Sequence, residues 1–505
     1  MLNPVLTQTG PVQGREDDGV RSWLGIPYAA PPWGRHRFAP PQAPTPWSSV
    51  RDASSYGPPA PQGLQLPGSE IPPSTDPAPD CLTLNIWAPS AAPEALPVMV
   101  WFHGGAYLAG AGSERAYNGT ALVREGVLVV TVNYRMGVDG FGQIDGAVSN
   151  RGILDQIAAL EWVRDNIAGF GGDPQKVTIF GESAGAGCVL ALLTMPRARN
   201  LFHRAIAQSI PRMFFSPPLA HSVTQAVAAA AGIEGTADAR TLATLTPQTL
   251  ADATRLVIST MGNRADEWGT LAYTSSSSGP IFGPIVDGDT MPEDPWTALR
   301  NGAAREIPII TGHTRDEYRL FTALQKRFSI TTEEADTALH IFAPNGDADG
   351  YRAIMPQAEP GELYEKVNTD YLFLAPTLQA AMAGADAGGH VFVYELCIDP
   401  VGGMGSPHAI DLPLTFNTLD TEMGALLIPE PTDSVIESGI RMRSAWTRFA
   451  ATGNPGWPQW GPDQSVQIWG GENPVVRYPE SERLELSLTD SCGALELLQH
   501  QELGR

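Results

Sequence analysis

The sequence predicts an α/β protein with one large, mostly parallel central sheet that helices cover on both faces. Two observations support this class. Continuous apolar runs of strand length recur along the chain, as is typical of strands that are buried on both faces. Segments with helical spacing of apolar residues separate these runs, and alternation of strand with helix favours parallel pairing.

Five apolar runs are the expected strands of this sheet. They are residues 96–103, 126–134, 177–181, 306–314 and 390–396. A central strand is apolar throughout because both of its faces are covered. We therefore expect each run to lie between two layers of helices.

Three segments have the pattern of helices that cover such a sheet. They are residues 153–170, 222–233 and 437–453. In the first, apolar residues recur at helical spacing, and the segment is followed by Gly171 and Gly172, which is a common way for a helix to end. These segments supply the covering layers that the strands require.

We expect a single domain of residues 1–505 that carries two helical insertions. The insertions, at about residues 215–280 and 325–385, should form a lid or pocket region over the sheet. Residues 55–80 are rich in Pro, Ser and Gly, which predicts a long surface loop at the rim of a site.

The charge balance argues against two classes of partner. The sequence has 55 acidic and 32 basic residues and a net charge of −23, which disfavours nucleic acid and anionic membrane surfaces. No apolar run approaches the ~18 residues of a membrane helix. The N-terminus lacks a basic segment followed by an apolar run, so no secretory signal is expected.

Cysteine and histidine usage argues against a metal centre. Cys81, Cys188, Cys397 and Cys492 are far apart and form no CxxC pair, so neither a zinc site nor a disulfide framework is expected. The sequence also lacks HExxH and His-x-His motifs. We expect a cytoplasmic protein that uses no metal and no cofactor.

The stretch GESAG, residues 181–185, has the pattern of a nucleophile elbow. An expected strand precedes it and an apolar helix follows it, which is the context that such a turn requires. The turn would expose Ser183 as a nucleophile, while Gly181 and Gly185 would avoid collisions with the neighbouring strand and helix. The alternative is a glycine-rich turn with an incidental serine.

A serine nucleophile needs a histidine base, and the base should follow it in the chain. Among the histidines after Ser183, His408 lies in the loop VGGMGSPHAIDLP, which follows the expected strand 390–396. Loops at the carboxyl ends of parallel strands are where sheet enzymes build their sites. His390 begins that strand instead, so its side chain should be held in the sheet.

An acid should orient the base, and it should leave the end of an intervening strand. Asp316 and Glu317 both follow the expected strand 306–314 directly. Reasoning from the residues alone leaves both acids open.

The oxyanion of an acyl-transfer intermediate needs preorganised N–H donors. The segment WFHGGAYLAG supplies a glycine-rich turn at Gly104, Gly105 and Ala106 after an early strand. The N–H of Ala184, directly after the nucleophile, would be one further donor. The alternative is a plain glycine turn.

With these motifs the chain resembles the type-B carboxylesterases, which include bacterial para-nitrobenzyl esterases and the cholinesterases. The resemblance implies an α/β-hydrolase fold and hydrolysis of small-molecule carboxylic esters through an acyl-enzyme. The matching segments, which span nearly the whole chain, are GIPYAAPPWGRHRF, DCLTLNIWAP, WFHGGAY, VNYRMG, GILDQIAALEWVRDNIAGFGGDPQKVTIFGESAGAG, GPIVDGDTMPEDP, GHTRDEYRLF, GSPHAIDLP and WTRFAATGNP.

The family motifs imply a role for each position. Ser183 would be the nucleophile, His408 the base and Glu317, preferred over Asp316, the acid of the triad. The implied oxyanion donors are the backbone N–H groups of three residues, Gly105, Ala106 and Ala184.

The resemblance also implies supporting residues. Ser209 would sit behind the triad, and Arg135 would form a buried pair with Asp155. Glu182, within the elbow itself, is a second acid close to the site.

The chain departs from the family pattern at several positions. Ala60 stands where the family often has the disulfide partner of Cys81, so Cys81 should be free. Pro79 replaces a glutamate that usually pairs with Arg37, and Ile210 replaces a glycine near the acyl pocket. None of these changes affects the expected triad.

The substrate stays open, although an apolar pocket is expected. An amide or carbamate hydrolase with the same triad is one alternative, and a non-catalytic interaction protein is another. We expect a monomer or a weak homo-oligomer. The candidate pocket residues, all next to triad or oxyanion segments, are Tyr107, Phe214, Phe215, Leu320, Phe321 and Phe416.

Overall fold

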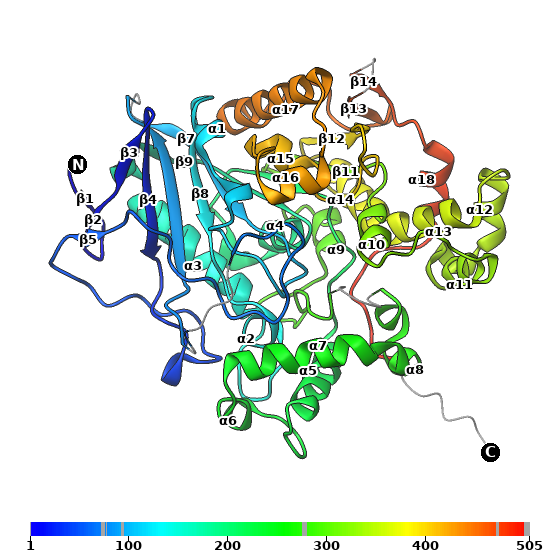
Figure 1. The fold of residues 1–505 in the computed structure, drawn as a ribbon, viewed down its shortest axis with the longest axis horizontal. Coiled ribbons are helices and arrows are strands. Elements are labelled where there is room, and N and C mark those ends of the chain that lie inside the picture. Colours follow the sequence, from blue (N-terminus) through cyan, green and yellow to red (C-terminus); the bar gives the residue numbers. More distant parts are fainter. Residues whose placement is uncertain are drawn as a thin grey trace.

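An 11-stranded sheet forms the centre of the protein in a computed structural model that describes residues 2–71, 76, 78–91, 95–274, 280–470 and 474–498 (Figure 1). The strand order is β14-β13-β12-β11-β10-β9-β7-β8-β6-β4-β3. The strands are β3 (Arg15–Asp17), β4 (Val20–Pro27), β6 (Thr83–Pro89), β7 (Leu96–Phe102), β8 (Leu128–Val132), β9 (Gly172–Glu182), β10 (Arg204–Gln208), β11 (Ile309–Thr314), β12 (Val391–Leu396), β13 (Ser465–Trp469) and β14 (Val475–Arg477).

The sheet is parallel at its centre and antiparallel at both edges. All neighbours from β8 through β7, β9, β10, β11 and β12 to β13 are parallel. Strands β14, β6, β4 and β3 join antiparallel. A second sheet of β1 (Val5–Leu6), β2 (Pro11–Gln13) and β5 (Arg51–Asp52) lies near the N-terminus. The prediction of a large, mostly parallel sheet is confirmed. The antiparallel strands at its edges were not predicted from the sequence.

Two apolar layers cover the faces of this sheet. Along β7, Val98 and Val100 face the layer that contains α3 (Arg151–Asn166) and α4 (Ala184–Thr194). Met99 and Trp101 alternate with them and face the layer of α15 (Asp411–Phe416) and α17 (Asp433–Thr452). Alternate residues are apolar on both sides, which explains the continuous apolar runs of the sequence.

The predicted helices are present. Residues 153–170 form most of α3 and a following 3-10 turn, and residues 222–233 lie mainly in α5 (Pro217–Ala230). Residues 437–452 lie in α17, and Gly453 caps its C-terminus. The remaining α-helices outside the two insertions are α1 (Thr120–Val123), α2 (Gly137–Phe141), α9 (Pro295–Arg300), α10 (Arg319–Leu324), α16 (Glu422–Leu427) and α18 (Ser481–Ser487).

The regions expected as insertions are helical in their described parts. The first holds α5, α6 (Ala239–Leu242), α7 (Pro247–Thr260) and α8 (Ala265–Trp268), and its residues 275–279 lie outside the described part. The second holds α11 (Thr332–Phe342), α12 (Ala348–Ile354), α13 (Pro360–Thr369), a π-helical turn at Asp370–Leu374 and α14 (Ala375–Asp386). Helices α11 to α13 gather beside α18 at the side of the molecule away from β3 and β4 (Figure 1).

Two arginine pairs hold the region around α2 and α3. Arg135 and Asp155, a pair that the family resemblance implies, are fully buried and lie 2.7 Å apart. Arg37, which lacks its usual glutamate at Pro79, pairs instead with Asp139 at 2.9 Å. The departure at residue 79 therefore leaves Arg37 with a carboxylate partner.

All four cysteines are free thiols, as expected for Cys81. Cys81 is fully buried, and Ala60 is buried as well. Within the described residues, no helix combines the length and the apolar character that a membrane span requires.

Candidate active site

Ser183 stands at a sharp corner between β9 and α4. Its backbone has φ 56° and ψ −124°, a conformation that non-glycine residues rarely adopt. A Cβ at Gly181 would lie 2.6 Å from the backbone of Gly185, and one at Gly185 would lie 2.0 Å from Phe102 O. Both glycines are therefore required because the corner has no room for side chains. The turn has the geometry of a nucleophile elbow.

His408 and Glu317 lie together beside this corner. His408 Nδ1 is 2.5 Å from Glu317 Oε2, and Glu317 is fully buried. Glu317 Oε1 also accepts hydrogen bonds from Ser209 Oγ at 2.5 Å and from the N–H of Thr314 at 2.8 Å. Burial alone would raise the pKa of Glu317, but His408 and these donors hold it below its usual value. Glu317 thus remains an anion that can orient the imidazole.

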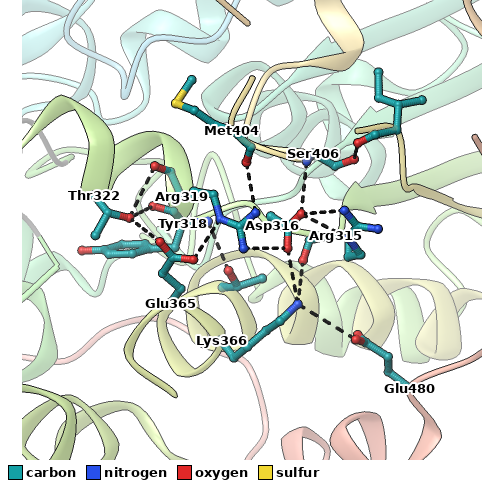
Figure 2. A network of polar contacts seen from close by, with 12 residues as sticks. Arg315, Asp316, Tyr318, Arg319, Thr322, Glu365, Lys366, Met404, Ser406 and Glu480 are labelled. Atoms are coloured by element: carbon teal, nitrogen blue, oxygen red, sulfur yellow. Dashed lines mark hydrogen bonds and ion pairs between the residues drawn. The ribbon is translucent and has the colours of Figure 1, made fainter. Parts of the chain in front are cut away.

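The neighbouring acid, Asp316, occupies a different environment. Figure 2 shows its carboxylate among Arg315, Arg319 and Lys366, with oxygen-to-nitrogen distances of 3.1, 3.4 and 3.6 Å. Asp316 makes no contact with the His408 ring in this network. The geometry therefore distinguishes two adjacent acids that the residue pattern left equivalent.

The second ring nitrogen of His408 faces another carboxylate. His408 Nε2 lies 3.1 Å from Glu182 Oε1, and both side chains are buried. Burial raises the pKa of Glu182 to about 8. Burial opposes protonation of His408, but the carboxylates of Glu182 and Glu317 prevail and raise its pKa to about 9.

Because Glu182 and His408 favour each other's charged form, they titrate as a coupled pair. A proton on Glu182 removes the charge that raises the pKa of His408. Among the described residues, Ser183 donates no hydrogen bond to His408 in this arrangement, in which Nε2 faces Glu182.

Two aromatic rings that line the cavity pack against the imidazole ring of His408. The ring centroids of Phe373 and Phe321 lie 4.4 and 5.4 Å from the imidazole centroid. Phe373 belongs to the π-helical turn at Asp370–Leu374. Sequence reasoning missed Phe373, because nothing in the residue pattern connects this insertion with the base.

A polar network that the sequence did not suggest is centred on Asp411, which lies near Glu317 and His408. Gln208 Nε2 donates to Asp411 Oδ2 at 2.6 Å, and Tyr394 OH donates to the same oxygen at 3.1 Å. Burial raises the pKa of Asp411 to about 6. Trp446 Nε1 donates to Gln208 Oε1 at 3.2 Å, which links the network to α17. The one sequence signal was the position of Asp411, three residues after His408.

The glycine turn after β7 lies opposite the elbow. Gly105 has φ 108° and Ala106 has φ 58°, so the backbone is in the left-handed region. A Cβ at Gly105 would lie 2.0 Å from Ala109 O. Ala184 is the first residue of α4. All three residues line the same cavity as Ser183, where backbone N–H groups could bind an oxyanion.

The cavity above Ser183 and His408 has a volume of about 440 Å³. Among the predicted pocket residues, Tyr107, Leu320 and Phe321 line it. Its apolar wall also includes residues that sequence reasoning missed, among them Leu64, Leu66, Pro67, Met213, Leu372, Phe373, Met423, Leu426 and Leu427. Leu64, Leu66 and Pro67 lie within the segment 55–80 that was expected to be a rim.

The other three predicted pocket aromatics lie outside the lining that the described residues form. Phe214 packs on Trp296, with ring centroids 5.2 Å apart. Phe416 packs on Trp101 at 5.0 Å in the layer of α15 and α17. Phe215 is fully buried. These side chains belong to the core because proximity in sequence to a triad segment does not decide which way a side chain points.

Comparisons with known proteins identify the family of the chain. The model of the carboxylesterase family matches residues 3–469. A para-nitrobenzyl esterase of Bacillus subtilis is 38% identical over 500 residues, which cover 95% of this chain and 97% of that protein. A probable N-octanoylanthranilate hydrolase of Rhodococcus erythropolis is 36% identical over 91% of this chain and 95% of its own length.

Solved structures share the overall fold of this chain. A PNB esterase structure superposes with a TM-score of 0.82 at 36% identity and covers 95% of this chain and 98% of its own. A carboxylesterase of Geobacillus stearothermophilus gives a TM-score of 0.81 at 34% identity and covers 96% and 99%. The fold is therefore the α/β-hydrolase fold. The chain belongs to the carboxylesterase family, and it is a carboxylic ester hydrolase.

Proposed function

We propose that this carboxylesterase hydrolyses esters through an acyl-enzyme on Ser183, with His408 as base and Glu317 as the orienting acid. One observation carries the proposal. The bond between Glu317 and His408 Nδ1 leaves Nε2 as the nitrogen that can take a proton on the side of the elbow. A strained serine, a buried His–Glu pair and a cavity thus meet at one place.

The reaction would run in two halves. Ser183 Oγ attacks the ester carbonyl while its proton passes to His408 Nε2, and Glu317 stabilises the imidazolium that forms. The N–H groups of Gly105, Ala106 and Ala184 bind the oxyanion. The imidazolium then protonates the leaving alcohol. Water repeats the sequence on the acyl-enzyme, which releases the acid and restores Ser183.

Glu182 would set the proton distribution around the base. Its carboxylate lies 3.1 Å from the nitrogen that must be free to accept the proton of Ser183. We propose Glu182 and Ser209 as supporting residues that tune and orient the triad without forming bonds to the substrate.

The lining of the cavity favours small esters with apolar groups. Leucine, methionine and aromatic side chains make up most of its wall, and about 440 Å³ is ordinary for a small-molecule site. An amide or carbamate substrate is the second candidate, because one relative is named for an N-acyl compound. A kinetic series of esters of increasing acyl length, with one matched amide and one matched carbamate, separates these candidates.

We also propose that the enzyme works in a reducing compartment. The support is that its four cysteines are free and that three of them are buried.

The experiment that tests the assignment is the pair Ser183→Ala and Ser216→Ala. Ser183 is half-buried and lines the cavity, whereas Ser216 is buried and lies outside its lining. Ser183→Ala should lower kcat by a factor of order 10⁴ or more, and Ser216→Ala should leave it nearly unchanged. A folded Ser183→Ala protein with a tenth of the wild-type activity would refute the proposal and would mean that another group is the nucleophile.

A further inference from the structure

Asp316 lies in a cationic environment that the reaction does not use. It follows β11 directly, its side chain is 5% exposed, and three cations surround it (Figure 2). Burial alone would raise the pKa of Asp316, but Lys366, Arg319 and Arg315 hold it below its usual value. A buried carboxylate with this many partners is a fixed anion.

This anion is bound to the loop that carries His408. The N–H of Asp316 donates to Ser406 O at 2.9 Å, and the N–H of Ser406 donates back to Asp316 Oδ2 at 3.1 Å. Two residues further along, the N–H of His408 donates to Glu317 O at 3.2 Å. The segment of Asp316 and Glu317 and the loop of residues 404–408, called the base loop below, are therefore joined by hydrogen bonds at successive positions.

The cations extend these contacts along the base loop. Arg319 Nη1 donates to Met404 O at 3.2 Å. Gly405, which lies between Met404 and Ser406 in the chain, has φ 75°. A Cβ at this position would lie 2.5 Å from Arg319 Nη1 and 2.7 Å from Asp316 Oδ2. The loop can approach the cluster this closely only because residue 405 is glycine.

The same cluster reaches helix α13. Lys366 Nζ donates to Arg315 O at 3.2 Å, and Arg319 Nε pairs with Glu365 Oε2 at 3.0 Å. Helix α13 continues directly into the π-helical turn that places Phe373 against the His408 ring. The cluster thus connects three elements that surround the base.

We propose that Asp316, together with Arg319 and Lys366, is a positioning residue that holds His408 against Glu317 in the cavity that Ser183 lines. The proposal rests on the proposed triad. Asp316 touches no reacting atom and acts through the backbone of residues 404–408. A displacement of about 1 Å in a catalytic group can cost about 100-fold in rate, so a modest shift of this loop would be visible in kcat.

The central test compares Asp316→Leu with Asp316→Asn. Leucine removes the acceptor for the N–H of Ser406 and should lower kcat by about 100-fold, with KM within about threefold, because the cavity wall is unchanged. Asparagine keeps an oxygen acceptor and should recover much of this loss, to within about tenfold of the wild type. If residue 316 has no role in positioning, Asp316→Asn should not recover kcat relative to Asp316→Leu.

A matched control and a direct readout complete the design. Asp139→Asn removes the charge from another arginine-paired carboxylate, outside the cavity lining, and should leave kcat within about twofold. The downfield proton resonance of His408 Nδ1–H, which reports its bond to Glu317, should shift or broaden in Asp316→Leu and stay in place in Asp139→Asn.

Lys366 provides a second route in case Asp316→Leu does not fold. Lys366→Met should lower kcat by about threefold to tenfold with little change in KM. Lys366→Arg should restore kcat, because an arginine side chain at this position can also reach Asp316. A folded Asp316→Leu enzyme with kcat within twofold of wild type would overturn the proposal. An unchanged kcat in Lys366→Met would overturn it equally. Either result, with Ser183→Ala inactive, would leave the triad intact, whereas an active Ser183→Ala would refute the triad itself.

Discussion

At the scale of single residues, the two adjacent carboxylates of Asp316 and Glu317 have different partners. Glu317 meets His408, Ser209 and a backbone N–H, while Asp316 meets three cations and the base loop. The residue pattern alone could not separate them, since both follow the same strand. The direction of each side chain at the strand end decides the assignment.

A first prediction follows for the two acids. Glu317→Gln should lower kcat/KM by about 10⁴-fold, because a neutral amide neither stabilises the imidazolium nor fixes its tautomer. Asp316→Asn should cost about tenfold, because the acceptor for Ser406 remains. Steady-state kinetics of the two purified variants checks this order. A more severe effect at Asp316 would contradict the assignment of the acid.

A second prediction concerns the pH profile. His408 acts as a base only when neutral, so activity should fall as the pH drops through its pKa. The carboxylates of Glu182 and Glu317 raise that pKa, which places the acid limb of kcat/KM above the ordinary histidine value of about 6.5. Glu182→Gln removes one of the two carboxylates, so the limb should move to lower pH, by about one unit or more.

The measurement is kcat/KM from low to high pH for the wild type and for Glu182→Gln, with unfolding followed in parallel. A limb that stays in place, or one that moves to higher pH in Glu182→Gln, would show that Glu182 does not raise the pKa of the base. A profile without an acid limb would exclude a histidine base.

At the scale of elements, the strands and helices around the elbow could be predicted well. The expected strands 96–103 and 177–181 correspond to β7 and to part of β9, because buried strands are apolar throughout. Strand β10 was not predicted, since its five residues, RAIAQ, begin and end with polar side chains. Short central strands of this kind depend on neighbours that the local pattern does not reveal.

The cavity wall and the polar network around Asp411 were predicted less well, because both depend on how distant elements pack. The contact between Gln208 and Asp411 joins residues 203 positions apart. Phe373 reaches His408 from within an insertion. Contacts of this range arise from the arrangement of whole elements, so no local pattern could have identified them.

A third prediction tests the elbow as an element. Gly185→Ala places a Cβ about 2.0 Å from Phe102 O, so either β7 or α4 must shift. We expect a loss of unfolding free energy of about 1–3 kcal/mol and a large loss of activity. Gly361→Ala, on α13 with no atom within 4 Å of the added Cβ, is the control and should be neutral or slightly stabilising. Denaturant unfolding of both variants measures the difference, and an equally stable Gly185→Ala would contradict the steric argument.

At the scale of the whole molecule, one sheet joins both ends of the chain. Strands β3 and β4 from the N-terminal part lie at one edge, and β13 and β14 lie at the other (Figure 1). We propose on this ground that the chain is a single domain. The proposed triad joins elements along nearly half of the sequence, so its geometry depends on the integrity of the sheet.

A fourth prediction concerns the whole fold and its cysteines. Cys81 is a free, buried thiol, so no disulfide contributes to stability. Addition of reductant should leave the midpoint of thermal unfolding unchanged. Mass spectrometry of the non-reduced protein should find four free thiols after denaturation. A lower midpoint in reductant together with a bridged Cys81 peptide would contradict this account.

The most direct test of the central claim is to trap the acyl-enzyme. A short-chain ester is mixed with the enzyme, the reaction is quenched in acid, and the peptides are mapped by mass spectrometry. We expect one acyl group on the peptide that contains Ser183 in the wild type and in Ser216→Ala, and none in Ser183→Ala. Acylation at another residue, or rapid turnover of the ester by folded Ser183→Ala, would contradict a mechanism based on this serine.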